Sequence, residues 1–461
     1  MGKQLSIEKL LNPQSFLHFA LIWTTFIYAV RWSWYVGGAF LMVLPIYASC
    51  LIIYNLTQKK RKLPFFPTLI VSIYYLYIFI IHILHRDIAE HGAGDFYCFA
   101  FILVCLLSGS KEEYVERFVL VCKTMLYISI VVGIASIICS ELKITNYSAI
   151  PSMLRNTIQA ITDGYDEARK NGLMGNPNST GHWCAYGLMF GTVVLFLNPH
   201  SLKYKLLFII DLLLTIYILV ITGSRAALLS ILIFAFLLLL FYFLYLKKYL
   251  PSDFNKFINY VVITIIILIF LILIFFIISN NFSYWVLSFL RIPFSENSST
   301  SDLINSTLLS FKDASNRGNL RQYSIQAWKD NPIFGISTSN LILDYFEPGS
   351  TINTKNGSHH LFIQLLATTG IIGFILHIAI WASSIIGVRL AFKVSKKNKE
   401  VDSTIINTFT TIMLIVILID NLFEVYLYTS ITIMALLGFF VLSNGLVNLN
   451  RNIKDEKDHN N

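Results

Sequence analysis

The chain is built from long apolar runs that recur from one end to the other. Twelve of these runs approach the roughly 20 residues that a helix needs to cross a bilayer. Apolar residues follow one another within each run, without the alternation of a membrane β-strand. The pattern therefore predicts an all-α polytopic membrane protein with about 12 transmembrane helices, in a single integral membrane domain over 1–461. The runs are 16–30, 36–54, 64–84, 96–109, 118–139, 182–197, 206–222, 226–245, 258–279, 361–391, 404–419 and 425–446.

The composition excludes a water-soluble protein. Hydrophobic residues make up 56% of the chain and charged residues 13%, whereas soluble proteins are roughly 45–50% apolar and about 25% charged. The 35 Lys and Arg outnumber the 26 Asp and Glu, but they fall in short stretches between apolar runs and do not form one soluble basic face. The lipid bilayer is therefore the expected partner, and nucleic acid is not.

The basic residues also predict the direction in which the chain crosses the membrane. They follow the second, fourth, sixth, eighth, tenth and twelfth runs. Because cytoplasmic loops carry an excess of Lys and Arg, this pattern places those loops and both termini in the cytoplasm. Two long polar loops, 140–181 and 280–360, then lie on the outer face, the second between helices 9 and 10. Long loops carry function more often than short ones.

The first of three clusters that could carry chemistry is Thr-Gly-Ser-Arg at 222–225, between the seventh and eighth runs. Gly223 permits a tight turn, Ser224 can cap the next helix, and Arg225 enters its first turn. A guanidinium group at the membrane edge usually has an anionic partner, because burying it alone is unfavourable. The alternative is an interfacial anchor whose charged end reaches up to water.

The second cluster, 317–335, contains Arg321, Trp328 and Asn-Pro-Ile-Phe-Gly at 331–335. Its spacing suggests an amphipathic helix over 321–329 that Pro332 ends. Guanidinium groups bind phosphate oxygens through two parallel bonds, which an ammonium group cannot do, so Arg321 is a candidate phosphate ligand. A solvated surface helix is the alternative.

The third cluster is the pair His359-His360 at the start of the tenth run. A His at the mouth of an apolar helix can titrate near neutrality and take a proton from a hydroxyl group, so the pair is a candidate general base. A metal site is the alternative. Neighbouring helical residues point to different faces, however, and no third ligand stands at metal spacing, so neither a metal nor a cofactor is expected.

The order of these clusters resembles the O-antigen ligase and O-antigen polymerase family, membrane glycosyltransferases that use polyprenyl-diphosphate-linked sugars. Four features carry the resemblance. They are Gly-x-x-Gly-Asn-Pro-Asn at 172–178 with Gly181 following, Thr-Gly-Ser-Arg at 222–225, Arg321 ten residues before Asn-Pro-x-x-Gly, and His359 eleven residues before Gly-x-x-Gly at 370–373.

The resemblance implies a metal-independent, inverting glycosyltransferase that acts at the outer face of the bacterial cytoplasmic membrane on a polyprenyl-diphosphate-linked oligosaccharide. Arg225 and Arg321 would bind the diphosphate of this donor, and His359 would remove the proton of the acceptor hydroxyl. The large outer loop 280–360 would bear catalytic elements. A flippase and a chain-length regulator would be partners.

The chain departs from the family pattern at three positions. His360 stands where the family usually has Asn, Thr368 where it often has Glu, and Ala226 where Gly is common. The doubled His leaves open whether His359 or His360 acts as the base.

Three activities fit these features. We favour a polysaccharide polymerase of the O-antigen or capsule type, because chains rich in Lys, Asn and Ile are common in the surface-polysaccharide clusters of low-GC Gram-positive bacteria. A ligase would transfer the glycan to another acceptor. A lipid-linked sugar transporter or flippase should instead show repeat symmetry and ionisable residues at mid-membrane, whereas the charged residues of the three clusters lie at the outer rim.

Overall fold

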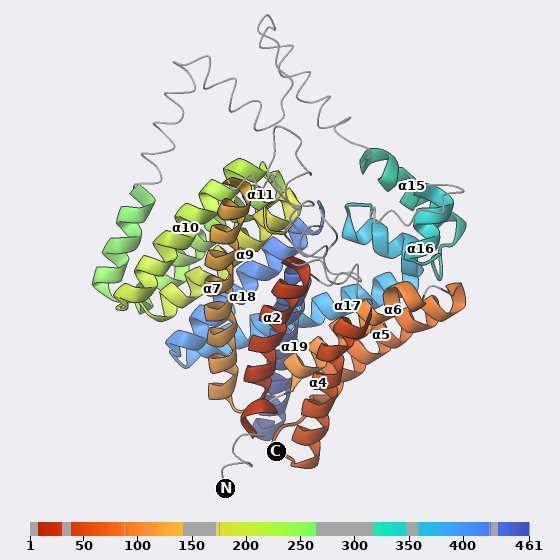
Figure 1. The fold of residues 1–461 in the computed structure, drawn as a ribbon. Coiled ribbons are helices and arrows are strands. Elements are labelled where there is room, and N and C mark those ends of the chain that lie inside the picture. The colour runs from red at the N-terminus through yellow and green to blue at the C-terminus, as the bar shows by residue number, and fades with distance from the viewer. Residues whose placement is uncertain are drawn as a thin grey trace, which may run out of the picture.

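The fold is helical and is seen here in a computed structural model (Figure 1). The structure describes residues 8–29, 38–86, 88–107, 109–141, 172–174, 176–263, 317–346, 358–423, 425 and 432–460, and it has no strand in these ranges. The helices are α2 (Pro13–Ala29), α4 (Gly38–Thr57), α5 (Phe65–His85), α6 (Ile88–Leu106), α7 (Lys111–Glu141), α9 (Pro177–Leu197), α10 (Leu202–Thr222), α11 (Arg225–Phe241), α15 (Arg317–Asp330), α16 (Thr338–Asn340), α17 (Leu361–Lys397), α18 (Val401–Asp420) and α19 (Ile433–Asn460). A π-helical turn (Tyr242–Leu246) follows α11, and another (Leu341–Phe346) follows α16.

The predicted polytopic helical membrane protein is confirmed. Within the described ranges, eight helices are long and apolar enough to cross a membrane, and α4 and α6 are apolar over shorter stretches. α6 begins eight residues before the predicted run 96–109 and includes small residues that precede it. Most of the run 258–279 and of the loops 140–181 and 280–360 lies outside the described residues, so the count of 12 spans and the single-domain division stay predictions.

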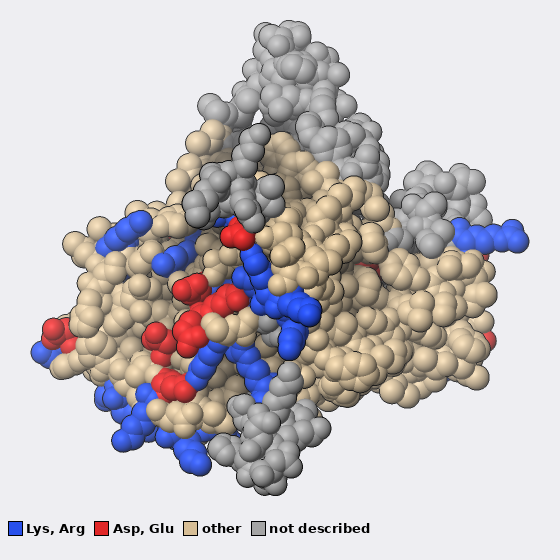
Figure 2. Space-filling model, turned by 90° about the horizontal axis from the view of Figure 1, so that it is seen from below, with Lys and Arg blue, Asp and Glu red and all other residues tan. Residues whose placement is uncertain are grey.

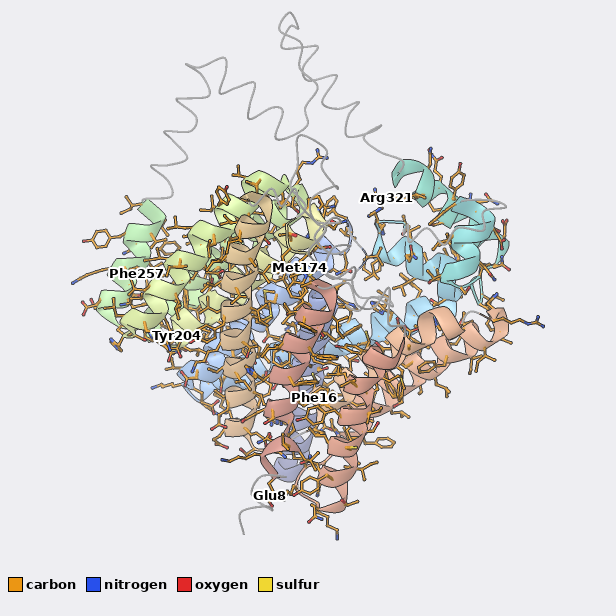
Figure 3. All side chains as sticks on the ribbon, viewed as in Figure 1. Glu8, Phe16, Met174, Tyr204, Phe257 and Arg321 are labelled. Atoms are coloured by element: carbon orange, nitrogen blue, oxygen red, sulfur yellow. The ribbon has the colours of Figure 1, made fainter. Side chains whose placement is uncertain are left out.

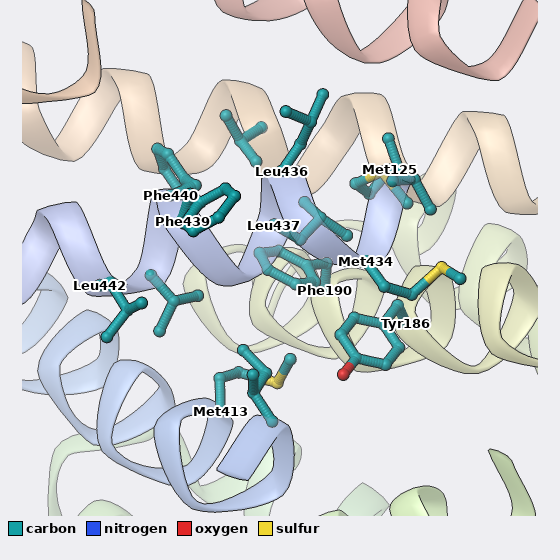
Figure 4. Packing of buried hydrophobic residues seen from close by; sticks show 14 of the residues in the cluster. Met125, Tyr186, Phe190, Met413, Met434, Leu436, Leu437, Phe439, Phe440 and Leu442 are labelled. Atoms are coloured by element: carbon teal, nitrogen blue, oxygen red, sulfur yellow. The ribbon is translucent and has the colours of Figure 1, made fainter. Parts of the chain in front are cut away.

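Two helices, α9 and α19, form the centre of the bundle. In each, 94% of the membrane-spanning stretch is buried, against 22% for α11. α9 contacts α7, α10, α11 and α18, and Figure 4 shows Phe190 of α9 and Leu437 of α19 among the packed core residues, with Met413 of α18 close by. Helices without an exposed polar face are expected at such a position.

The peripheral helices direct large apolar side chains outward. Leu76 of α5, Leu213 of α10 and Phe236 of α11 are all mostly exposed. Apolar surface of this extent is unfavourable in water, but lipid tails are as apolar as these side chains. The exposed surface is therefore the surface of a protein that lies in a bilayer.

Lys and Arg gather at one end of the bundle, which Figure 2 shows from below. There Arg61 donates to Glu113 at 2.6 Å, and Lys60 pairs with Glu8 at 2.8 Å. Arg321 lies at the opposite end of the molecule from Glu8 (Figure 3). We call the Lys- and Arg-rich end the basic end. Its existence agrees with the predicted sidedness, and which end faces the cytoplasm stays a prediction.

α17 is broken at Gly370. This residue has φ 63° and ψ −168°, which are not helical, so residues 361–369 form a short first part ahead of a longer second part. The break accounts for the unusual length of the predicted run 361–391.

Residues 331–337, which we call the clasp, replace the hydrogen bonds that the break removes from α17. Two clasp N–H groups donate to α17 carbonyls before Gly370, and a clasp carbonyl accepts from an α17 N–H after Gly370. A tyrosine hydroxyl of α5 donates to one more α17 carbonyl. The bonds run from Ile336 N to Ala367 O (3.0 Å), Ser337 N to Thr368 O (3.0 Å), Ile371 N to Pro332 O (2.9 Å) and Tyr77 Oη to Thr369 O (2.7 Å). Irregular backbone at a membrane span is stable only when its polar groups are paired in this way.

Gly335 of the clasp and Gly370 of α17 pack backbone against backbone. Both have positive φ, 70° and 63°. A Cβ on Gly335 would lie 2.4 Å from the carbonyl carbon of Thr368, and one on Gly370 would lie 2.1 Å from the carbonyl oxygen of Ile333. Only glycine fits either position. The Asn-Pro-x-x-Gly and Gly-x-x-Gly stretches therefore occur together because they form one structure.

Candidate functional site

Several described helices meet at the end of the bundle opposite the basic end. α9, α11 and α17 begin there, and α10 and α18 end there. The backbone N–H of Leu361 donates to the carbonyl of Asn421 at 2.8 Å, which joins α17 to α18. Gly181 of α9 packs so closely against Ser224 that a Cβ would lie 2.6 Å from the Ser224 Cβ. We call this the site end, because the predicted site residues lie on it.

Arg321 lies in the second turn of α15 and reaches the start of α17 and the end of α18. Its Nη2 donates to the carbonyl oxygen of His359 at 3.2 Å and to that of Leu422 at 3.4 Å. These two bonds use one nitrogen of a group that carries five N–H donors. The structure thus brings together two of the three predicted site residues, which stand 38 positions apart in the sequence.

The α15 segment matches the predicted amphipathic helix that ends before Pro332. Ser324 and Ala327 are buried, while Gln322 and Gln326 are exposed. Because α15 packs on α17 and continues into the clasp, it is more than the solvated surface helix that we considered as the alternative.

His360 caps α17. Its Nδ1 accepts the backbone N–H of Ile363 at 3.4 Å. Burial, and then the positive charge of Arg321, lower the pKa of His360 below its usual value of 6.5. Both effects favour the neutral ring, which is also the form that can accept this bond.

His359 has a positive φ of 52°, a conformation that few residues other than glycine adopt. The surrounding bonds hold it in place: Ser358 N donates to Gln364 Oε1 at 2.7 Å, and the Ser358 hydroxyl donates to the carbonyl of His360 at 3.0 Å. Ser358 and Gln364 are buried, whereas His359 is only half-buried. A strained residue whose neighbours are fixed in this way is often a functional one.

Arg225 is the first residue of α11 and is half-buried. Gly223 ends α10 with φ 57°, as the predicted tight turn requires. Ser224 occupies the cap position, but its side chain makes no capping hydrogen bond, so the expected side-chain cap is wrong. Arg225 lies at the site end beside α9, and its convergence with Arg321 and His359 stays a prediction.

The Gly-x-x-Gly-Asn-Pro-Asn stretch starts α9. The Oδ1 atom of Asn176 accepts the backbone N–H of Asn178 at 2.9 Å, and Pro177 is the first helical residue. Gly172 has φ 64°, and a Cβ there would lie 2.6 Å from the Thr180 Cγ2. The part of this stretch that the structure describes therefore fixes how the central helix enters the bundle.

A buried histidine–aspartate pair, which the sequence motifs did not indicate, lies inside the bundle next to the site end. His182 Nε2 is 2.9 Å from Asp420 Oδ1, and both side chains are fully buried. His182 Nδ1 donates to the carbonyl of Asn178 at 2.7 Å, because a carbonyl can only accept. The Tyr186 hydroxyl donates to the other Asp420 oxygen at 3.0 Å. The available signal was an ionisable residue at the edge of an apolar run, which is rare in membrane helices.

This pair connects the chain segments that carry the predicted site residues. The two residues after Asp420 accept the hydrogen bonds from Leu361 and Arg321 described above. His182 directly follows the glycine that packs against the turn before Arg225. The His182–Asp420 pair is therefore placed to hold the site end together. Among the residues described, no three His, Cys, Asp or Glu side chains gather as a metal site, and metal independence stays a prediction.

The helices and a comparison with known protein families indicate the class to which this protein is similar. The long apolar helices define a multi-pass membrane protein. Residues 210–378, which include Arg225, Arg321 and His359, match the O-antigen ligase family, so the predicted resemblance is confirmed. Comparison with curated protein sequences gives no match.

Proposed function

We propose that the protein is a polysaccharide polymerase that joins oligosaccharide repeat units from polyprenyl-diphosphate donors at the outer face of the cytoplasmic membrane. The observation that carries the proposal is the 3.2 Å bond from Arg321 Nη2 to the carbonyl oxygen of His359. This bond holds a proposed diphosphate ligand beside a proposed base. The family match supports glycan transfer of the ligase or polymerase type.

The site end offers positive potential to a diphosphate. α9, α11 and α17 all begin there, and each helix N-terminus acts as about half a positive charge. Arg225 and Arg321 add two guanidinium groups. A diphosphate gains negative charge as its bond to the sugar breaks, and fixed positive groups stabilise that transition state. In this scheme the protein's own charges neutralise the leaving group without a metal ion.

His359 acts on the acceptor. It removes the proton of the acceptor hydroxyl, and the oxygen attacks the anomeric carbon of the donor from the side opposite the diphosphate. The new carbon–oxygen bond forms, the bond to the diphosphate breaks, and its electron pair leaves with the diphosphate oxygen. One displacement of this kind inverts the anomeric configuration. His360 suits the role less well because its Nδ1 caps α17.

The basic end supports the proposed orientation, because Lys and Arg favour the cytoplasmic side and the site end lies opposite to it. A ligase would use the same donor chemistry with another acceptor. The Lys-, Asn- and Ile-rich composition favours the polymerase.

A reconstituted system tests the proposal. Vesicles containing the protein and a polyprenyl-diphosphate-linked repeat unit are expected to yield polymer, and His359→Ala should leave single repeats unjoined. His200→Ala is the matched control, since His200 is exposed between α9 and α10, away from the site end. Polymer of normal length from a folded His359→Ala protein would exclude His359 as the base. Single transfer to a different acceptor would identify a ligase.

A further inference from the structure

The tip of the clasp exposes two large apolar side chains. Ile333 is 52% exposed and Phe334 is 54% exposed, whereas residues 335–338 are buried. The clasp backbone is fixed by its hydrogen bonds to α17, so these side chains are held outward. Rigid exposure of apolar side chains marks a contact surface.

The surface around this tip is apolar and belongs to two membrane helices. Ile371, whose N–H is bonded to the clasp, is 37% exposed, and Ile375 one turn later is 58% exposed. On α5, Leu76 precedes the tyrosine that is bonded to the break and is 61% exposed. The tip therefore continues the outward apolar surface of α5 and α17.

The clasp also lies alongside these helices and not beyond their ends. Tyr77 stands eight residues before the last residue of α5, about 12 Å along the helix axis. Gly370 stands nine residues after the start of α17, roughly 13 Å along its first part. The contact with both positions brings the clasp beside the apolar length of the spans.

We propose that Ile333 and Phe334 insert among the acyl chains of the bilayer, so that the C-terminal end of α15 is anchored in the membrane. The occupant of this surface is lipid, because the surface is continuous with two lipid-facing spans and the clasp backbone is bonded to α17 on both sides of the tip, at Pro332 and at Ile336. The anchoring does not depend on which reaction the site performs.

Spin labels test the insertion directly. Single cysteines replace Ile333 or Phe334 in a chain whose Cys50 and Cys139 are Ser, and the labelled protein is placed in nanodiscs of phosphatidylglycerol and phosphatidylethanolamine. We expect both labels to collide several-fold more with oxygen, which concentrates in acyl chains, than with a water-soluble nickel chelate. Ile375→Cys serves as the lipid-facing control, and Gln326→Cys, on the exposed side of α15, serves as the water-facing control.

Two results would overturn the proposal. Labels at 333 and 334 that collide preferentially with the nickel chelate, as at 326, would place the tip in water. Labels that neither probe reaches would show that a second copy or another protein covers it. The parent chain without an added cysteine measures any background labelling.

Discussion

Arg321 Nη2 donates a hydrogen bond of 3.2 Å to the carbonyl oxygen of His359, and the same nitrogen lies 3.4 Å from the carbonyl oxygen of Leu422. One guanidinium group thereby joins α15, the turn before α17 and the end of α18. Arg321 consequently has a structural role as well as its proposed role in binding, and experiments on it need a separate measure of folding.

Conservative replacement of the two arginines tests the diphosphate site. Arg321→Lys and Arg225→Lys keep the charge but lose the planar pair of donors, so each should slow polymer formation about 100-fold, the usual effect of losing one transition-state donor. The measurement is the initial rate in vesicles, with thermal unfolding as the check on structure. Arg389→Lys, an exposed change on α17, is the control. Near-normal rates in both variants would remove these arginines from the diphosphate site.

The His182–Asp420 pair should behave as one unit in stability. Removing either partner leaves the other buried without its counterpart, which typically costs about 3–5 kcal/mol. His182→Ala and Asp420→Ala should each lower the unfolding midpoint, and the double variant should be destabilised by much less than the sum. Strictly additive effects would show that the two side chains do not interact.

The glycines at the break test the clasp. Gly335→Ala and Gly370→Ala each place a Cβ within 2.4 Å of backbone atoms, so both should reduce stability and activity together. Gly318→Ala, on α15, meets nothing within 4 Å and should instead stabilise that helix by about 0.5–1 kcal/mol. Thermal unfolding in detergent compares the three. Tolerance of alanine at both 335 and 370 would mean that the two backbones do not pack as described.

His360 makes stability depend on pH. Since its folded pKa lies below 6.5, the unfolded chain binds a proton at this residue first as the pH falls, and the folded state loses stability below about pH 6.5. His360→Asn keeps a good cap without the titration. The stability of the wild type relative to this variant should therefore fall on acidification. Parallel unfolding curves between about pH 5 and 7.5 would contradict this role.

A chelator tests whether the protein's charges suffice for the reaction. Activity in vesicles should be unchanged after treatment with EDTA, because the proposed scheme uses guanidinium groups and helix N-termini at the diphosphate. A strict requirement for added magnesium or manganese would show that these charges do not neutralise the leaving group alone.

Much of the helical architecture follows from the sequence because it depends on local apolar length. Apolar runs predict where helices lie, and the order of the motifs predicts the family. The Arg321–His359 contact could be anticipated only as part of a resemblance, since nothing in the residues themselves specifies a bond across 38 positions.

Two features could not be predicted because they depend on tertiary contacts. His182 and Asp420 pair across 238 residues. In the sequence, each is a single polar residue at the edge of an apolar run, and nothing links the two. The break at Gly370 contains no proline, and it is stable only because the clasp and Tyr77 supply hydrogen bonds from elsewhere in the chain.

Biogenesis of the protein follows from the break in α17. An ordinary span leaves the translocon with its peptide groups already satisfied by its own helix, but α17 satisfies several of them only through residues 332–337 and Tyr77. Those segments are synthesised earlier and must already be folded next to α17 when it forms these hydrogen bonds. We therefore expect α17 to mature late, as a step of assembly within the membrane, and the site end to form only after that step.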